Sequence, residues 1–204
     1  RHTARHPDWP ALPQHEFLAE DAWQQTAYGG NAIYDHGHHG NAILSRHTIL
    51  SQANQDVSDH RFESRGLLHC EVKIAGIERP VHCVCVHLGL TAGSRRRQMA
   101  AIVARLDQLA PGGAPLIIAG DFNDWRNTLS DKLRNALGVV EVFDQRASNS
   151  ALGDLVRTLA RRQTKTPVPV PARTFPAALP WFRLDRIYVR GLQPIKATVE
   201  PDDR

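Results

Sequence analysis

Apolar and β-branched residues are concentrated in two runs in the middle of the chain, RGLLHCEVKI (65–74) and RPVHCVCVHLGL (79–90). The four residues between them, AGIE, include a glycine, so this arrangement predicts a β-hairpin whose second strand ends at about His87. Upstream, NAILS (41–45) predicts a short buried strand. The first 40 residues are rich in Trp, Pro, His and Gly without sustained periodicity, which predicts irregular structure leading into the sheet.

A helical pattern follows the hairpin. Apolar residues then recur at helical spacing, at Met99, Ile102, Val103, Leu106 and Leu109. This spacing predicts an amphipathic helix that Ser94 caps and the Gly112-Gly113 pair ends. The run PLIIA (115–119) is wholly apolar and predicts a short strand buried on both faces. The order strand, helix, strand predicts an α/β fold with covered sheets.

The last third of the chain predicts two further helices, over about 130–137 and 152–162. The segment TKTPVPVPARTFP (164–176) contains four prolines and favours an extended connector. FRLDRIYVRG (182–191) alternates as a strand does, with Asp185 near its middle. No repeat or linker divides the chain, so we expect one domain over residues 1–204.

Composition narrows the class of protein. The chain is 42% hydrophobic and 23% charged, and no run approaches the roughly 20 apolar residues of a membrane span. Its net charge of +4 is compatible with a polyanionic partner but does not indicate a dedicated nucleic-acid binder. Three cysteines are too few for a disulfide framework, and the opening RHTARHPDWP lacks the apolar core of a signal peptide. We expect a cytoplasmic monomer without a membrane span.

The stretch PLIIAGDFNDW (115–125) places Asp121, Asn123 and Asp124 directly after an apolar strand. Side chains at such a position lie at the carboxyl edge of a sheet, where α/β folds commonly bind ligands. Gly, Asp and Asn also form ordinary turns, and the stretch alone favours a turn. Three companions favour a site: GNAILSR, VHLGL with His87, and RTFP followed by LDRIYV.

Four of these segments, GNAILS, VHLGL, GDFND and LDRIYV, occur in an order that resembles the endonuclease/exonuclease/phosphatase superfamily, with its deoxyribonuclease I-like fold. The resemblance covers residues 28–190 and is closest to small bacterial members of unassigned substrate. It implies a four-layer α/β/β/α sandwich and divalent-metal-dependent hydrolysis of a phosphoester, in the first place a phosphodiester. The cofactor implied is Mg²⁺ or Mn²⁺.

The resemblance also implies roles for single residues. Asp121 resembles the aspartate that orients and activates the attacking water, and Asn123 the asparagine that holds the metal or a phosphate oxygen. His87 resembles the histidine that hydrogen-bonds the scissile phosphate, and Asp185 the aspartate that supports a second catalytic histidine. Thus Asp121 and Asn123 are the expected metal ligands. The expected substrate-binding residues are Asn41, Arg95 and Thr174.

The chemistry of phosphoester hydrolysis requires residues of these types. In-line attack builds negative charge on the phosphoryl oxygens, so catalysis depends on positioning and on cations. Mg²⁺ prefers oxygen ligands and keeps several waters, which suits Asp121, Asn123 and Asp185 as ligands or as acceptors beside them. His87 adds a donor whose charge can change near neutral pH.

Two motifs of the superfamily are absent from these residues. We find no Gln-Glu pair before Gly40, and VEPDDR ends the sequence without the Asp-His motif. We therefore expect the domain to lack the superfamily's N-terminal and C-terminal strands over 1–204. Two other interpretations stay open: a DNA or RNA endonuclease or exonuclease, and a catalytically impaired binding or scaffold module of the same fold.

Other clusters are weaker candidates for chemistry. Cys83, Cys85 and His87 lie two residues apart on a strand, about 6.6 Å for each step, which is too far for one tetrahedral zinc ion, so free buried cysteines are favoured. DHGHH (35–39) is interpreted as a polar loop rather than a metal site. Arg95–Arg97 suit phosphate contact or a solvated surface, and the polar loop 56–66 suggests the rim of a site.

Overall fold

Two β-sheets and three helices make up the described part of the computed structural model, which comprises residues 14–19, 22–35, 37–143 and 183–198. The predicted helix over 152–162, the proline-rich segment 164–176 and Thr174 lie outside the described residues. The helices are α1 (Gln14–Ala19), α2 (Ala92–Leu109) and α3 (Ser130–Leu137). No helix in the described ranges has the length and hydropathy needed to cross a membrane.

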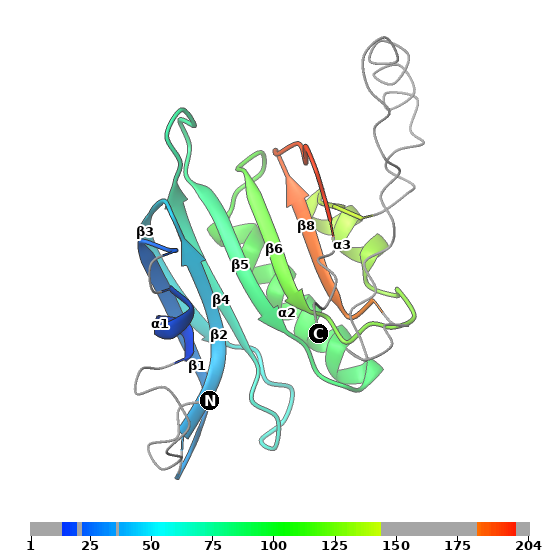
Figure 1. Ribbon diagram of the computed structural model, residues 1–204. Coiled ribbons are helices and arrows are strands. Elements are labelled where there is room, and N and C mark those ends of the chain that lie inside the picture. Colours follow the sequence, from blue (N-terminus) through cyan, green and yellow to red (C-terminus); the bar gives the residue numbers. More distant parts are fainter. Residues whose placement is uncertain (1–13, 20–21, 36, 144–182, 199–204) are drawn as a thin grey trace.

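The smaller sheet is an antiparallel ribbon of β1 (Gln25–Tyr34) and β2 (Gly37–Ser45). The larger sheet has six strands in the order β3-β4-β5-β6-β8-β7 (Figure 1). Its strands are β3 (Thr48–Asp56), β4 (Gly66–Lys73), β5 (Val81–His87), β6 (Leu116–Asp121), β7 (Val140–Glu141) and β8 (Asp185–Arg190). Strands β5 and β6 are parallel and are connected through α2, whereas the other pairs in this sheet are antiparallel.

These elements form four layers. Met99, Ile102 and Leu106 of α2 are buried in one core with Val84, Val86 and Ile118 of the sheet. On the opposite face of the large sheet, Ala27 of β1 packs in a second core with Leu68, Cys70 and Val72 of β4. Tyr28 points to the outer face of the ribbon, where the His15 ring of α1 stacks on it at 4.4 Å between centroids. The predicted four-layer α/β/β/α sandwich is therefore confirmed.

Several predicted elements are confirmed within a few residues. The β4–β5 hairpin, α2, β6 and α3 all form where the sequence predicted them. The cap of α2 was predicted wrongly, because Thr91 rather than Ser94 accepts the hydrogen bond, from the Ser94 backbone N–H at 3.1 Å. Asp185 is the first residue of β8 rather than a residue near its middle.

The prediction of irregular structure before residue 41 was wrong. Helix α1, all of β1 and the first half of β2 lie there, and NAILS is only the end of β2. The prediction that PLIIA is buried on both faces was also wrong. Leu116 and Ile118 face the α2 core, but Ile117 and Ala119 are half-buried because the ribbon lies over β3, β4 and β5.

Candidate functional site

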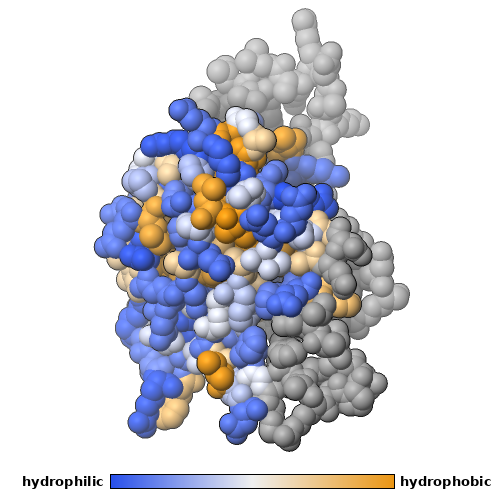
Figure 2. All heavy atoms as spheres, turned by 90° about the vertical axis from the view of Figure 1, so that its left-hand side faces the viewer, coloured by the Kyte–Doolittle hydropathy of each residue, from blue (hydrophilic) through white to orange (hydrophobic). Residues whose placement is uncertain are grey.

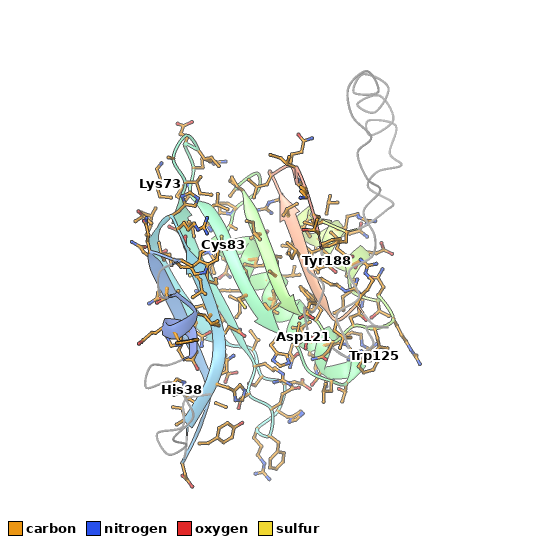
Figure 3. All side chains as sticks on the ribbon, viewed as in Figure 1. His38, Lys73, Cys83, Asp121, Trp125 and Tyr188 are labelled. Atoms are coloured by element: carbon orange, nitrogen blue, oxygen red, sulfur yellow. The ribbon has the colours of Figure 1, made fainter. Side chains whose placement is uncertain are left out.

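Three of the predicted site residues lie side by side at one edge of the large sheet. In the parallel pairing of β5 with β6, His87 is the partner of Asp121, and in the antiparallel pairing of β6 with β8, Asp121 is the partner of Asp185. The three residues thus form a row across adjacent strands, named here the strand-end row. Nε2 of His87 lies 3.7 Å from Oδ2 of Asp121, and both side chains are partly exposed. Figure 3 shows Asp121 at the lower end of the sheet.

The backbone at the end of β6 is shaped for this position. Gly120 has a φ of +146°, and a Cβ there would lie 1.9 Å from the Val86 carbonyl oxygen, so no larger residue fits. Asn123 follows in the left-handed region with a φ of +49°, which asparagine tolerates better than most residues. Its backbone N–H donates to Oδ1 of Asp121 at 2.8 Å, and this bond orients the carboxylate.

The side chain of Asn123 connects two loops. It is buried, and its Nδ2 donates to the Leu88 carbonyl at 2.8 Å, just past His87. The amide nitrogen is therefore committed to the backbone. The carbonyl oxygen is the atom of this side chain that could contact a metal or a phosphate.

Asp124 fixes the loop between β6 and α3. Its carboxylate is buried and accepts hydrogen bonds from the Thr128 hydroxyl at 3.0 Å and the Leu129 N–H at 2.8 Å. Arg186 of β8 donates to the Asp124 carbonyl at 2.8 Å, and Glu141 of β7 forms an ion pair with Arg186 at 3.2 Å. The loop that follows Asp121 is thus held by buried charges from the neighbouring strands.

Asn41 and Arg95 both bind backbone carbonyls around His87. Nδ2 of Asn41 donates to the carbonyls of Gly66 at 2.8 Å and Cys85 at 3.1 Å, which ties β2 to the large sheet. Arg95 is buried and donates to the Leu90 carbonyl at 2.6 Å, while its guanidinium lies 5.0 Å from the Trp125 ring centroid. Their predicted contact with substrate stays a prediction.

Two charged neighbours of His87 were missed by sequence reasoning, Arg65 and His39. Burial lowers the pKa of His87, the positive charge of Arg65 lowers it further, and Asp121 opposes the shift. His39 lowers this pKa to a smaller extent, and Asp185 raises it. His87 therefore favours its neutral form, which still donates one N–H. The sequence signal for Arg65 is its place directly before β4, opposite the end of β5.

The donors of Arg65 are incompletely used. Its Nε is buried and has no hydrogen-bond partner among the described residues, and it lies 3.8 Å from the Glu63 carboxylate. That carboxylate also accepts from the Ser94 hydroxyl at 3.2 Å and from Gln98. The Glu63 carboxylate is therefore the ionic partner of Arg65 among the described residues. The predicted role of the loop 56–66 as the rim of a site stays a prediction.

Neither the strand-end row nor any other described cluster brings together three His, Cys, Asp or Glu ligands for a metal ion. Cys70, Cys83 and Cys85 are free, as predicted, but only Cys70 is buried, whereas Cys83 and Cys85 are half-buried. The interpretation of residues 35–39 as a polar loop was wrong for His38 and His39, which lie on β2, with Nδ1 of His38 2.7 Å from the Tyr28 hydroxyl. His36 lies outside the described residues.

The oxygen donors at the strand-end row are of the chemical type that a hard divalent cation binds. Asp121 and Asp185 supply carboxylates from adjacent strands, and Asn123 supplies an amide oxygen two residues after Asp121. Mg²⁺ is commonly held by one or two carboxylates together with water and substrate oxygens, rather than by an all-protein cage. Among the described residues, Asp121, Asp185 and Asn123 could hold such an ion.

Sequence comparisons place the chain among known proteins. A family model described as the Endonuclease/Exonuclease/phosphatase family matches residues 4–203. The uncharacterized protein YbhP of Escherichia coli K12 is 39% identical over 194 residues, which is 95% of this chain and 68% of that protein. YbhP of Shigella flexneri gives the same values.

Solved structures agree with the fold. The catalytic domain of human Nocturnin, with a bound sulfate anion, superposes with a TM-score of 0.55 at 18% identity, over 81% of this chain and 60% of that one. An endonuclease/exonuclease/phosphatase protein from Beutenbergia cavernae gives 0.55 at 18% identity, over 86% of this chain and 48% of that one. A mannosyl-6-phosphatase from Bacteroides thetaiotaomicron superposes with a TM-score of 0.53 at 14% identity, over 80% of this chain and 62% of that one. At these identities the likeness shows the fold.

Proposed function

This chain belongs to the endonuclease/exonuclease/phosphatase family, and on that premise we propose that it hydrolyses a phosphodiester by in-line attack of an activated water, with Mg²⁺ or Mn²⁺ as cofactor. The observation that carries the proposal is the strand-end row. His87, Asp121 and Asp185 come from segments up to 98 residues apart and are paired in register at one sheet edge. This row combines two carboxylates with a neutral imidazole, the set that water activation and phosphate binding require.

Each residue has a proposed task. Asp121 orients the attacking water and accepts its proton, with the Asn123 N–H holding the carboxylate in place. His87, which favours its neutral form, donates an N–H to a phosphoryl oxygen. Asp121, Asp185 and the amide oxygen of Asn123 would hold the divalent cation. When bound, this cation neutralises the charge that develops on the phosphoryl oxygens.

Arg65 extends the set of phosphate contacts. The positive charge of its guanidinium lowers the pKa of His87, and its Nε forms an ion pair with Glu63 at 3.8 Å. A phosphodiester carries one negative charge before attack, and the planar guanidinium presents N–H donors that match the geometry of phosphate oxygens. Nocturnin, which shares the fold, binds a sulfate anion. We propose that Arg65 binds a non-bridging oxygen of the substrate.

The single domain over residues 1–204 is proposed to lack strands of the family's second sheet. In the described part of the chain, the β1–β2 ribbon lies over β3, β4 and β5. On the same face, β6 and β8 carry the half-buried Ile117 and the exposed Ile187. Apolar side chains on a sheet face are normally covered by another layer. The sequence encoded on either side of these residues tests this proposal, since an upstream Gln-Glu pair and a downstream Asp-His motif are expected.

Turnover of bis-p-nitrophenyl phosphate by the protein with its flanking strands tests the activity. We expect hydrolysis with Mg²⁺ or Mn²⁺ that EDTA abolishes, and a loss of at least about 100-fold for Asp121→Ala. The matched control is Asp131→Ala, since Asp131 is exposed on α3 and forms an ion pair with Arg134. No turnover with either metal would favour the scaffold interpretation, and near-normal turnover by Asp121→Ala would remove Asp121 from the mechanism.

A further inference from the structure

The loop between β3 and β4 (57–65) is attached to the first turns of α2 by two carboxylates. Asp59 forms an ion pair with Arg97, and its Oδ2 accepts a hydrogen bond from the Ser94 hydroxyl at 2.8 Å. Glu63 lies further along the loop, and its carboxylate accepts a hydrogen bond from Nε2 of Gln98 at 2.5 Å. Figure 1 shows this loop in cyan at the lower end of the large sheet, and Figure 3 shows the Asp121 end of the strand-end row there too.

Glu63 differs from Asp59 because it also pairs with an arginine of its own loop. Oε1 of Glu63 lies 3.8 Å from Nε of Arg65, whereas Oε2 is the atom that accepts from Gln98. Hydrophilic side chains cover most of the lower part of the described surface in Figure 2, as expected where water solvates them. The Glu63 and Arg65 side chains depart from this pattern, since they are 10% and 16% exposed. Water therefore screens this ion pair weakly.

The same carboxylate lies against the connection that follows His87. A Cβ at Gly89 would lie 2.2 Å from Oε1 of Glu63, so a side chain at this position would displace the oxygen. Oε1 of Gln98 accepts from the Gly89 N–H at 2.8 Å, while Nε2 of the same side chain donates to Glu63. Gln98 is buried. A buried glutamine therefore joins the Glu63 carboxylate to the backbone two residues after His87.

Arg65 lies where this network meets the strand-end row. In the pairing of β4 with β5, Leu67 is the partner of Val86, so Arg65 lies opposite the residues that follow His87. The positive charge of Arg65 lowers the pKa of His87, so the guanidinium and the imidazole are close enough to interact. A free arginine side chain samples many rotamers, and fixing it costs conformational entropy. A partner that already fixes the guanidinium removes part of this cost from ligand binding.

We propose that Glu63 is a positioning residue that holds the Arg65 guanidinium in the orientation in which it contacts the substrate phosphate. The inference rests on the proposed hydrolysis and assigns a task to a side chain outside the strand-end row. Glu63 occupies the Nε edge and the Ser64 carbonyl accepts from Nη1 at 3.4 Å, so among the described contacts Nη2 is the nitrogen left for a phosphate oxygen. Gln98 and Gly89 in turn fix the Glu63 carboxylate.

Two simpler roles for Glu63 predict different outcomes. If its negative charge acted only through space, removal of the charge would strengthen the binding of an anionic phosphate, because like charges repel. If Glu63 only attached the loop to α2, removal of the charge at Asp59, the other attachment, would have the same effect. Positioning predicts that loss of the Glu63 charge weakens phosphate binding and that loss of the Asp59 charge does not.

Side-chain NMR on the metal-free protein tests the positioning without turnover. We expect the Nε–H bond of Arg65 to have an order parameter near the rigid value of about 0.85, and Glu63→Gln to lower it below about 0.6. Glutamine keeps an oxygen that can accept from Gln98, so the variant should fold, which circular dichroism would verify. The matched control is Asp59→Asn, which removes one charge from the same loop and should leave the Arg65 order parameter unchanged. An unchanged order parameter in Glu63→Gln, or an equal fall in both variants, would overturn the proposal.

Kinetics of the protein with its flanking strands on bis-p-nitrophenyl phosphate test the consequence for substrate binding. Glu63→Gln should raise KM about 2- to 10-fold with little change in kcat, which corresponds to the entropy of one immobilised side chain. Because Glu63 acts through Arg65, the double variant Glu63→Gln with Arg65→Gln should match Arg65→Gln alone. A lower KM for Glu63→Gln, or losses that add in the double variant, would contradict positioning. Absence of turnover in the unchanged protein would refute the hydrolysis, whereas the NMR result would still decide whether Glu63 holds Arg65.

Discussion

Replacement of Asp124 by alanine should destabilise the protein more than any surface change. The carboxylate is 1% exposed and accepts hydrogen bonds from the Thr128 hydroxyl at 3.0 Å and the Leu129 N–H at 2.8 Å. A hydrogen bond to a charged group contributes about 1.5–3 kcal/mol, and an unsatisfied buried donor costs about 1–3 kcal/mol. Alanine removes both bonds and leaves the Leu129 N–H without its partner. Because these contributions overlap, we expect the free energy of unfolding to fall by about 3 kcal/mol.

Urea unfolding followed by circular dichroism measures this change, provided that the transition is two-state. At about 2–4 °C per kcal/mol for a chain of this size, the melting temperature should fall by about 6–12 °C. Asp124→Asn is the control, since its amide oxygen can still accept from Leu129 and its nitrogen can donate to the Thr128 oxygen. A loss below about 0.5 kcal/mol for alanine, or equal losses for both variants, would refute the reasoning.

Three further predictions concern titratable groups. Nε2 of His69 and Nδ1 of His82 lie 2.9 Å apart, and burial lowers the pKa of both rings, so the unfolded chain binds protons that the folded chain excludes. Stability should be complete above the ordinary pKa of about 6.5 and fall as the pH decreases below it, and His82→Gln should show a flatter pH dependence in chemical denaturation. Arg65→Gln should raise the pKa of His87 in a metal-free NMR titration, and Arg96→Gln should leave it unchanged. Burial raises the pKa of Cys70 and Cys83 to about 11, so Ellman's reagent at pH 8 should label both at least about 100-fold more slowly in the folded than in the urea-unfolded protein.

The sequence predicted the elements whose apolar spacing is local. The β4–β5 hairpin, α2, β6 and α3 each bury a repeating set of side chains, and periodicity detects such sets. Strand β3 is exposed over most of its length and therefore has no apolar alternation. The β1–β2 pairing depends on backbone contact, since a Cβ at Gly40 would lie 1.9 Å from the Gly29 carbonyl oxygen. Glycines that allow close approach favour irregular structure in any reading of the sequence, so this ribbon was missed.

The candidate site likewise contains residues that the local sequence could predict and residues that it could not. His87 and Asp121 could be placed from the ends of their strands, because a strand end is a local feature. Arg186 and Glu141 gave no signal, since they lie 62 and 17 residues from Asp124 in sequence and interact only after β7 and β8 have paired. In the sequence, Arg65 cannot be distinguished from any other arginine just before a strand. Only the pairing of β4 with β5 places it near His87.

The backbone around His87 is held by polar side chains from three different elements. Asn41 of β2 donates to the Cys85 carbonyl, Asn123 donates to the Leu88 carbonyl, and Arg95 of α2 donates to the Leu90 carbonyl. The described bonds thus fix the main chain on both sides of His87 and leave the imidazole partly exposed. A catalytic side chain needs such an arrangement, because its position must be fixed while its nitrogen atoms stay accessible to substrate. Asn41, Asn123 and Arg95 can therefore determine the geometry of the site whether or not they touch the substrate.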